Sequence, residues 1–234
     1  PTIQKADDVL LEVEAASICG TDCQILNVPA GHPATPGAVL GHEYVARVIE
    51  PGDGAQHLAP GDRVVIDPNL TCGLCRYCRM GLPNMCENMT TLGIFINGGF
   101  AKYNVAPARA LHPISQDLPT DIAIFAEPMS CVVNGGNKLA LRPGESVLVL
   151  GAGPIGLYYT ALMKAAGAGR IIVAEVTDMR AAKARDLGAD IVINPLKESL
   201  PDLIEKETEV GVDAAIDAVG SLLADALVNT RRGG

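Results

Sequence analysis

The stretch from Val147 to Gly156 constrains the fold more than any other part of this chain. Four apolar residues, 147–150, lead directly into a glycine-rich turn with the spacing Gly151-x-Gly153-x-x-Gly156. The next residues, 157–166, contain no helix breaker before Gly167. In a strand, turn and helix of this kind, a dinucleotide's pyrophosphate lies against the free amides of the helix N-terminus. The sequence therefore predicts a nucleotide-binding turn here.

Strand and helix patterns alternate after this turn. Three further segments have strand patterns: 170–175, 191–193 and 212–218. Three have helical patterns: 178–187, 201–208 and 222–229. This alternation predicts a parallel, doubly wound sheet, with four of the six strands of a complete nucleotide-binding sheet. We expect its last strand to present an unprotected edge.

The first half of the chain has a different character. Residues 9–16 alternate between apolar and charged or small side chains, as in a half-buried strand. Turn signals at 51–54 and 60–62 flank further short apolar segments, which favours a small β barrel or sandwich. A chain of 234 residues that is 48% hydrophobic can bury two cores. We therefore expect two domains, at residues 1–126 and 127–234.

Charge and hydropathy exclude several classes of partner. The formal net charge is −9, with 27 acidic and 18 basic residues and no cluster of Lys and Arg, so neither nucleic acid nor an anionic membrane surface is an expected partner. No apolar run of about 18 residues occurs, and the first residues do not resemble a signal peptide. These features predict a cytoplasmic protein.

Four of the seven cysteines form a local cluster with the spacing CxxCxxCx7C: Cys72, Cys75, Cys78 and Cys86. Four thiolates from one loop can surround a tetrahedral zinc ion and leave no open position for chemistry, so the spacing predicts a structural zinc lobe. A ferredoxin cluster has a final gap of three residues followed by proline, whereas here the gap is longer and Glu87 follows. The odd number of cysteines argues against a disulfide framework.

The order of several motifs identifies a family. They are Cys19-Gly20-Thr21-Asp22, Gly41-His42-Glu43, the four-cysteine lobe, Gly98-Gly99-Phe100-Ala101, Glu127-Pro128 and the glycine turn. In this order they resemble the zinc-dependent medium-chain dehydrogenases, in particular the polyol (sorbitol-type) and threonine dehydrogenase branch. The resemblance covers essentially the whole chain. It implies a GroES-like β-barrel catalytic domain, an incomplete Rossmann domain truncated together with it, and a homodimeric or homotetrameric full-length form.

The resemblance also implies a catalytic zinc ion, which is the second zinc of the chain. Its ligands by motif are Cys19, His42 and Glu127, and the fourth position is left for water or a substrate oxygen. Glu43 is adjacent to His42, and in such proteins it lies just behind the metal or ligates it through water. A thiolate, an imidazole and a carboxylate form a donor set that suits zinc.

Two residues near Cys19 match the proton-handling groups of the family. Thr21 matches the residue whose hydroxyl takes the substrate's proton, and Asp22 matches the acid that fixes the tautomer of His42. The chain departs from the family pattern at Gln24, where a histidine often continues the proton path. An amide cannot titrate, so Gln24 cannot replace a histidine in a relay.

The nucleotide site is expected to take NAD. Gly151 makes the tight turn, Gly153 admits the pyrophosphate, and Gly156 lets the helix pack closely. Pro154 and Ile155 complete the predicted cofactor-binding turn. Beyond it, Glu175 is placed to bind the ribose hydroxyls and to repel a 2′-phosphate, which favours NAD over NADP, whereas Arg180 is a counter-signal.

Three functions agree with these features. The first is an NAD-dependent zinc dehydrogenase that oxidises a secondary alcohol of the polyol class. The second is a threonine or simple alcohol dehydrogenase, in which the zinc, the cofactor and the hydride chemistry are unchanged. The third belongs to another class, because a truncated chain can be an inactive fragment that binds zinc and NAD.

Overall fold

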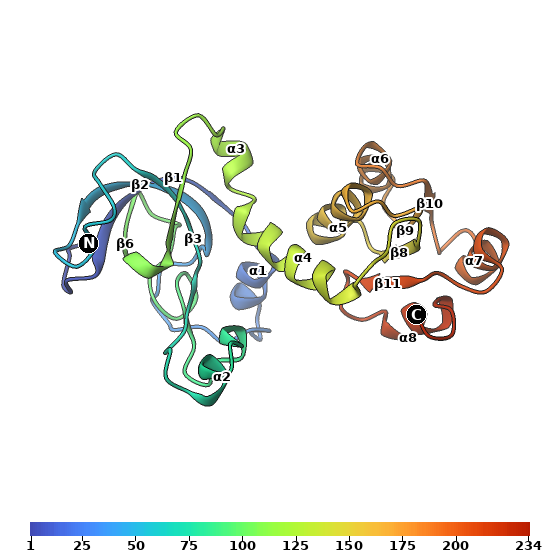
Figure 1. Cartoon of the computed structure of the whole chain (residues 1–234), viewed down its shortest axis with the longest axis horizontal. Coiled ribbons are helices and arrows are strands. Elements are labelled where there is room, and N and C mark those ends of the chain that lie inside the picture. The colour runs from blue at the N-terminus through green and yellow to red at the C-terminus, as the bar shows by residue number, and fades with distance from the viewer. The chain divides into compact units, whose positions relative to one another are not determined.

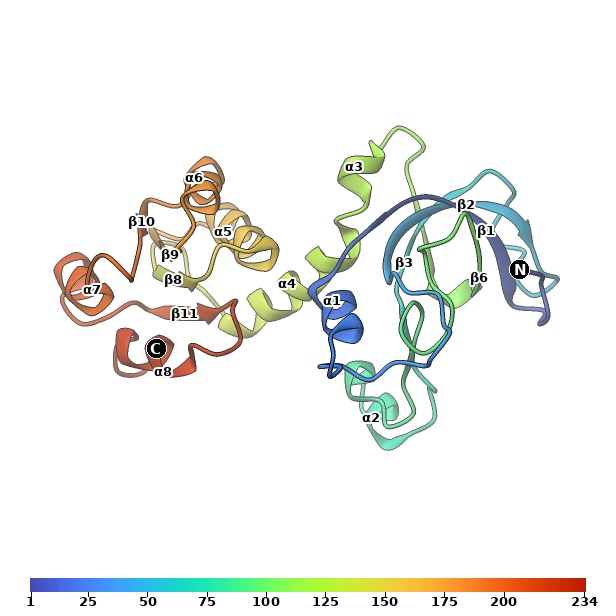
Figure 2. The ribbon, with the colours of Figure 1, turned by 180° about the vertical axis from the view of Figure 1, so that it is seen from behind.

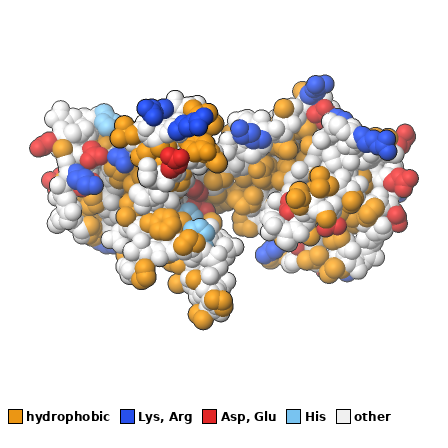
Figure 3. Space-filling view, turned by 90° about the horizontal axis from the view of Figure 1, so that it is seen from below, with side chains coloured by type: hydrophobic (Ala, Val, Ile, Leu, Met, Phe, Trp, Pro, Cys, Tyr) orange, Lys and Arg blue, Asp and Glu red, His pale blue; other side chains and the backbone are white.

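Figure 1 shows the computed structural model, which describes residues 1–234. The chain divides into two units, Pro1–Glu127 and Pro128–Gly234. The break expected after residue 126 lies one residue further along the chain. No helix in the structure combines the length and the apolar character needed to cross a membrane. On the face in Figure 3, Lys and Arg side chains are interspersed with acidic and apolar ones and form no single basic patch.

The first unit is built on a curved, five-stranded antiparallel sheet (Figures 1 and 2). In spatial order its strands are β6 (Tyr103–Pro107), β1 (Asp8–Ser17), β2 (Glu43–Pro51), β3 (Arg63–Ile66) and β7 (Leu111–Ile114). Its other elements are α1 (Gly20–Leu26), β4 (Asn69–Leu70), α2 (Arg76–Arg79), η1 (Pro83–Met85), β5 (Thr90–Thr91), η2 (Ala108–Ala110) and α3 (Thr120–Ala123). Side chains of this sheet form one apolar core that includes Leu11, Val48 and Val64.

The pairing of β1 with β2 places the candidate metal ligands. The two strands are antiparallel, and their register sets Ser17 opposite Glu43. Cys19 follows the end of β1, and His42 precedes the start of β2. Residues far apart in the sequence therefore meet at one end of this pair of interior strands.

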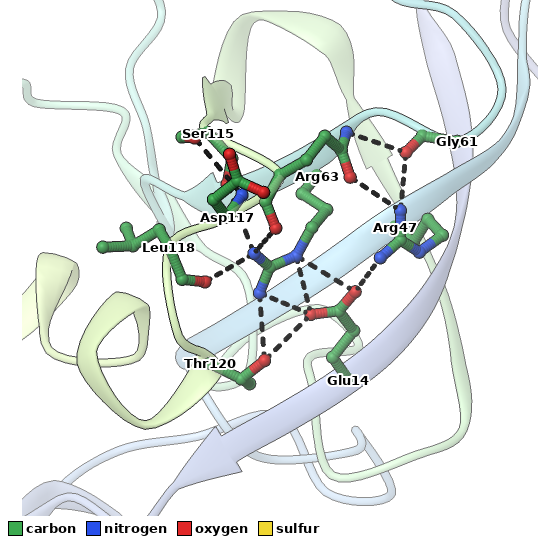
Figure 4. A network of polar contacts seen from close by, with 9 residues as sticks. Glu14, Arg47, Gly61, Arg63, Ser115, Asp117, Leu118 and Thr120 are labelled. Atoms are coloured by element: carbon green, nitrogen blue, oxygen red, sulfur yellow. Dashed lines mark hydrogen bonds and ion pairs between the residues drawn. The ribbon is translucent and has the colours of Figure 1, made fainter.

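A buried arginine ties the sheet to the segment that precedes α3 (Figure 4). The Arg63 side chain is 4% exposed and pairs with Glu14 of β1 at 2.9 Å. Its other donors reach the Thr120 hydroxyl and the carbonyl oxygens of Ser115, Gln116 and Leu118, at distances from 2.6 to 3.2 Å. The guanidinium uses its full fork of donors, which keeps the buried charge satisfied.

The second unit contains the predicted parallel sheet, in the order β10 (Ile191–Ile193), β9 (Arg170–Ala174), β8 (Ser146–Leu150) and β11 (Ala214–Asp217). Side chains from β8 alternate between two cores. Val147 and Val149 pack with residues of α5 (Pro154–Ala165) and α6 (Asp178–Asp186), whereas Leu148 and Leu150 pack with residues of α7 (Leu200–Thr208) and α8 (Leu223–Asn229). Helices therefore cover both faces, and the prediction of a doubly wound sheet is confirmed.

Helix α4 (Ala126–Leu139) is an element that the sequence patterns did not predict. Pro128 occupies its first turn, where a missing N–H costs no hydrogen bond. Gly136 also lies within the helix, and a Cβ there would come 2.9 Å from the Leu162 side chain of α5. Gly135 precedes it, and a Cβ there would lie 1.9 Å from the Tyr159 hydroxyl oxygen of α5. The apparent helix breakers are thus tolerated, Pro128 by its position and the two glycines because they permit close packing.

Candidate metal and nucleotide sites

Three predicted site residues meet where β1 ends and β2 begins. The ligand atoms of Cys19, His42 and Glu43 all lie within 4.8 Å of one another. His42 and Glu43 are each only 7% exposed. Ser17 holds Glu43 in place through a hydrogen bond from its hydroxyl to the carboxylate. A thiol, an imidazole and a carboxylate converging in a buried position form a donor set suited to zinc.

The environment of His42 orients its ring for a metal. Its Nδ1 atom lies 3.5 Å from Oδ1 of Asp22, which is itself 2% exposed. Both atoms are buried, and neither has a hydrogen-bond partner. The other Asp22 oxygen accepts the Cys19 amide at 2.9 Å. A proton on Nδ1 would point at this carboxylate and leave the Nε2 lone pair free for a cation, as around metal-bound histidines.

The ionisable groups at this site repel one another without a cation. Burial raises the pKa of the Cys19 thiol, and the charge of Glu43 adds to the rise, although hydrogen bonds from Thr21 oppose it. Burial, followed by repulsion from Glu43, raises the pKa of Glu127 to about 7. A bound divalent cation would reverse both effects. The residues present therefore fit the metal that the sequence implies.

Glu127 is the second residue of α4 and is partly buried. Asp67 contributes to its raised pKa, and His42 partly offsets the rise, so Glu127 shares the electrostatic environment of the site. Its role as the third ligand stays a prediction. Sequence reasoning missed Ser17 and Asp67, because nothing in their local patterns indicates which carboxylates they face.

The four cysteines of the predicted lobe also converge. Sulfur-to-sulfur distances are 3.5 Å for Cys75–Cys78 and Cys72–Cys86, and 3.9 Å for Cys75–Cys86. A tetrahedral zinc ion with bonds of about 2.3 Å requires sulfur separations of about 3.8 Å. The lobe geometry therefore fits a closed four-thiolate zinc site.

The thiols of the lobe have divergent acidities without a metal. Amide hydrogen bonds from Leu74 and Cys75 lower the pKa of Cys72 to about 6. Desolvation and the neighbouring thiols raise the pKa of Cys78 to about 12. Four thiolates at this spacing therefore need a cation to neutralise them.

The glycine turn of the second unit has the geometry of a nucleotide-binding turn. Gly151 has a φ of +88°, and a Cβ on Gly156 would lie 1.9 Å from the Gly151 carbonyl oxygen. The space beside Gly153 is open, because a Cβ there would meet no atom within 4 Å. The turn is tight where α5 packs and open where a ligand would approach.

Two acids at strand ends hold the loops around this turn. Glu175 follows β9, is 6% exposed, and accepts the Ala152 amide at 2.7 Å and the Thr177 amide at 2.8 Å. Burial alone would raise the pKa of Glu175, but these amides outweigh it and keep the pKa below its usual value. Asp217, at the end of β11, accepts the amides of residues 219, 220 and 222. The predicted ribose-binding acid is thus also a clamp on the turn.

A cavity of about 620 Å³ opens beside the turn. Its lining includes Gly151, Gly153, Glu175 and Arg180. Pro154 and Ile155 begin α5 at the same turn. The cavity has the size of a typical cofactor site.

Comparison with known proteins assigns the family. Two family models match the chain, Alcohol dehydrogenase GroES-like domain over residues 5–116 and Zinc-binding dehydrogenase over residues 154–234. A solved structure from Sinorhizobium meliloti 1021, described as a zinc-binding dehydrogenase and bound to NADP, is 32% identical with a TM-score of 0.93. The match covers 100% of this chain and 69% of that one. The chain belongs to the zinc-dependent medium-chain dehydrogenase family.

Other members of the family extend this comparison. L-threonine 3-dehydrogenase of Xanthomonas campestris pv. campestris (strain B100) is 37% identical over 217 residues, which are 92% of this chain and 64% of the relative. A structure from Escherichia coli CFT073, described as a short chain alcohol dehydrogenase complexed with cofactor NADH, is 32% identical with a TM-score of 0.88, and the match covers 96% of this chain and 66% of that one. This medium-chain dehydrogenase chain therefore spans about two thirds of its relatives' length. The predicted family and the GroES-like and Rossmann fold classes are confirmed.

Proposed function

We propose that the protein is a zinc-dependent oxidoreductase that transfers a hydride from a secondary alcohol to NAD. The observation that carries the proposal is the convergence of Cys19, His42 and Glu43, with the unpartnered Nδ1 of His42 facing Asp22. The open nucleotide turn and its cavity support the choice of a dinucleotide as the hydride acceptor.

The metal would be held by Cys19, His42 and Glu127, with Glu43 as a further ligand or an outer neighbour. A zinc ion there supplies Lewis-acid stabilisation for the negative charge that develops on an alcohol oxygen. Asp22 keeps the imidazole of His42 in the tautomer that presents Nε2. Ser17 holds the carboxylate of Glu43 at the site.

Thr21 is proposed as the group that takes the substrate's proton. It is partly exposed in α1 and hydrogen-bonds the Cys19 thiol, so its hydroxyl lies at the metal site. The exposed Gln24 follows in the same helix and cannot titrate, so we infer that the proton passes from Thr21 to solvent without a histidine relay.

The proposed cofactor is NAD. The buried negative charge of Glu175 disfavours a 2′-phosphate at the end of β9. Arg180 lines the same cavity and offers a positive charge for such a phosphate. One similar structure holds NADP and another NADH. NADP is therefore the alternative, and paired binding titrations of the two nucleotides decide between them.

A polyol is the proposed substrate, in keeping with the polyol (sorbitol-type) and threonine dehydrogenase branch that the motifs resemble. A threonine dehydrogenase is the second candidate, favoured by the 37% identity to L-threonine 3-dehydrogenase. The metal and nucleotide residues are the same in both cases. Only the groups that recognise the rest of the substrate differ.

The test is NAD reduction by zinc-loaded protein with a panel of sugar alcohols, simple secondary alcohols and L-threonine. Turnover with polyols that disappears in the Thr21→Val variant supports the proposal. An absolute requirement for L-threonine would replace the polyol by the second candidate. Zinc and NAD binding without turnover on any alcohol would instead indicate that this chain is an inactive binding fragment.

A further inference from the structure

Backbone contacts hold the residues just before His42 against a distant loop. The backbone of 39–41 runs beside that of 98–100 and receives three amide hydrogen bonds from it. The donor and acceptor pairs are Gly98 to Val39 at 2.8 Å, Phe100 to Leu40 at 2.9 Å and Gly99 to Gly41 at 2.7 Å. A fourth bond runs from the Val39 amide to the side-chain oxygen of Asn97, at 3.0 Å. We call residues 93–100 the buttress loop.

The contact between the buttress loop and Gly41 leaves no room for a side chain. A Cβ on Gly98 would lie 2.1 Å from the Gly41 carbonyl oxygen, whereas real Cβ contacts essentially never fall below 3.0 Å. A Cβ on Gly93 would lie 2.2 Å from the same oxygen and 2.8 Å from the His42 amide nitrogen. The peptide that joins Gly41 to His42 is therefore pressed directly by the loop.

The same loop also contacts the residue that follows Glu43. A Cβ on Gly99 would come 2.6 Å from the ring of Tyr44, which is 2% exposed. The Tyr44 hydroxyl accepts a hydrogen bond from Asn104 at 2.9 Å, so this ring has little freedom to move aside. The loop thus fixes the chain on both sides of His42 and Glu43.

We propose that the buttress loop positions His42 and thereby sets the metal affinity of the catalytic site. This inference rests on the proposed function, because it assumes that Cys19 and His42 hold a metal. The loop residues are positioning residues and are not assigned contacts with metal or substrate. They act through the backbone of Gly41, and an ångström-scale shift of that carbonyl would move the imidazole away from the other donors.

Gly98→Ala is the sharpest perturbation. The φ of Gly98 is not in the left-handed range, so alanine is conformationally allowed there. Its Cβ would come 2.1 Å from the Gly41 carbonyl oxygen and 2.3 Å from the Gly93 Cα, and both residues belong to the contact between the buttress loop and Gly41. Gly31→Ala is the matched control, because a Cβ at Gly31 meets its nearest atom at an ordinary 3.6 Å. Zinc stoichiometry and affinity are measured by competition with a chromophoric chelator, and His42→Ala identifies which zinc belongs to the catalytic site.

The catalytic-site zinc is the one that His42→Ala loses. Gly98→Ala is expected to bind this zinc at least about tenfold more weakly than the parent does, and to retain the lobe zinc. Gly31→Ala should match the parent. Should Gly98→Ala not fold, Asn97→Ala decides, because it removes one exposed anchor without a clash and should weaken the same zinc by several-fold.

Two failures remain distinguishable. Equal zinc stoichiometry in the parent and in His42→Ala would overturn the metal site itself, whatever the loop does. The second failure concerns only the loop. If His42→Ala loses a zinc that folded Gly98→Ala binds with parental affinity, the metal site stands and the positioning role of the loop is overturned. Where Gly98→Ala does not fold, parental zinc affinity in Asn97→Ala overturns the role of the loop in the same way.

Discussion

Removing the charge of Glu14 should destabilise the first unit through Arg63. The Arg63 guanidinium is 4% exposed, and Glu14 is its anionic partner at 2.9 Å (Figure 4). Breaking a buried ion pair by removing one partner costs about 3–5 kcal/mol. Because the Glu14 side chain is 19% exposed and Gln can still accept one hydrogen bond, we expect Glu14→Gln to cost about 2 kcal/mol.

The same ion pair has a pH signature. Burial alone would raise the pKa of Glu14, but the hydrogen bonds and charge of Arg63, with Arg47, hold the pKa below its usual value. A carboxylate with a depressed folded pKa stabilises the fold above the unfolded pKa of about 4.3, and that contribution is lost as pH falls through the folded value. The gap between the parent and Glu14→Gln should therefore narrow below about pH 4.

Urea unfolding followed by circular dichroism, at pH values from 7 to 3, measures both effects. With a slope of about 2 kcal/mol per molar urea, the expected cost moves the midpoint of the first transition by about 1 M at pH 7. Glu12→Gln is the control, since Glu12 pairs only with the exposed Lys102, at 3.8 Å. A loss below about 0.5 kcal/mol in Glu14→Gln, or a gap that does not change with pH, would refute the reasoning.

Three further predictions concern the four-cysteine lobe and the second unit. Adding zinc to metal-free protein at pH 7 should release at least one proton from the lobe, because the pKa of Cys78 is about 12 without a metal. Metal analysis should find one zinc fewer in Cys78→Ser than in the parent. Hydrogen bonds from the Ser146 amide and the Arg231 side chain lower the pKa of Asp213 to about 2. Asp213→Asn should therefore reduce the stability of the second unit by about 1 kcal/mol at pH 7. In thermal unfolding, this difference in stability between the parent and the variant should fade between pH 4 and 2. Glu175→Gln keeps only one acceptor for the amides of Ala152 and Thr177, so calorimetric titration should show NAD binding about tenfold more weakly.

The second unit was predictable because its signals are local. Apolar runs of strand length, a glycine turn and breaker-free helices each determine a neighbouring stretch of backbone, and the alternation of elements gives the sheet. Helix α4 was not predicted, because Pro128, Gly135 and Gly136 indicate a break when only the sequence is considered. The packing of Gly136 against α5 is a tertiary contact, which no local pattern encodes.

Glu175 shows a second limit of prediction from sequence patterns. Its spacing from the glycine turn predicted an acid beside the nucleotide, and the structure places it in the lining of the cavity. Spacing does not indicate that both of its oxygens already accept backbone amides. A bound ribose would share or displace these bonds, so the acid contributes to the shape of the turn before any cofactor arrives.

The two candidate metal sites differ in what assembles them. The four cysteines of the lobe lie in one short segment, so their spacing alone brings the sulfur atoms together. Cys19 and His42 instead meet because β1 and β2 pair in a register that sets Ser17 opposite Glu43. That register is chosen by the apolar side chains of the two strands, since a slip by one residue would turn Val9 and Leu11 out of the core. The proposed catalytic donor set is therefore a consequence of hydrophobic packing. The contact of Ser17 with Glu43 likewise becomes visible only once the strands are paired.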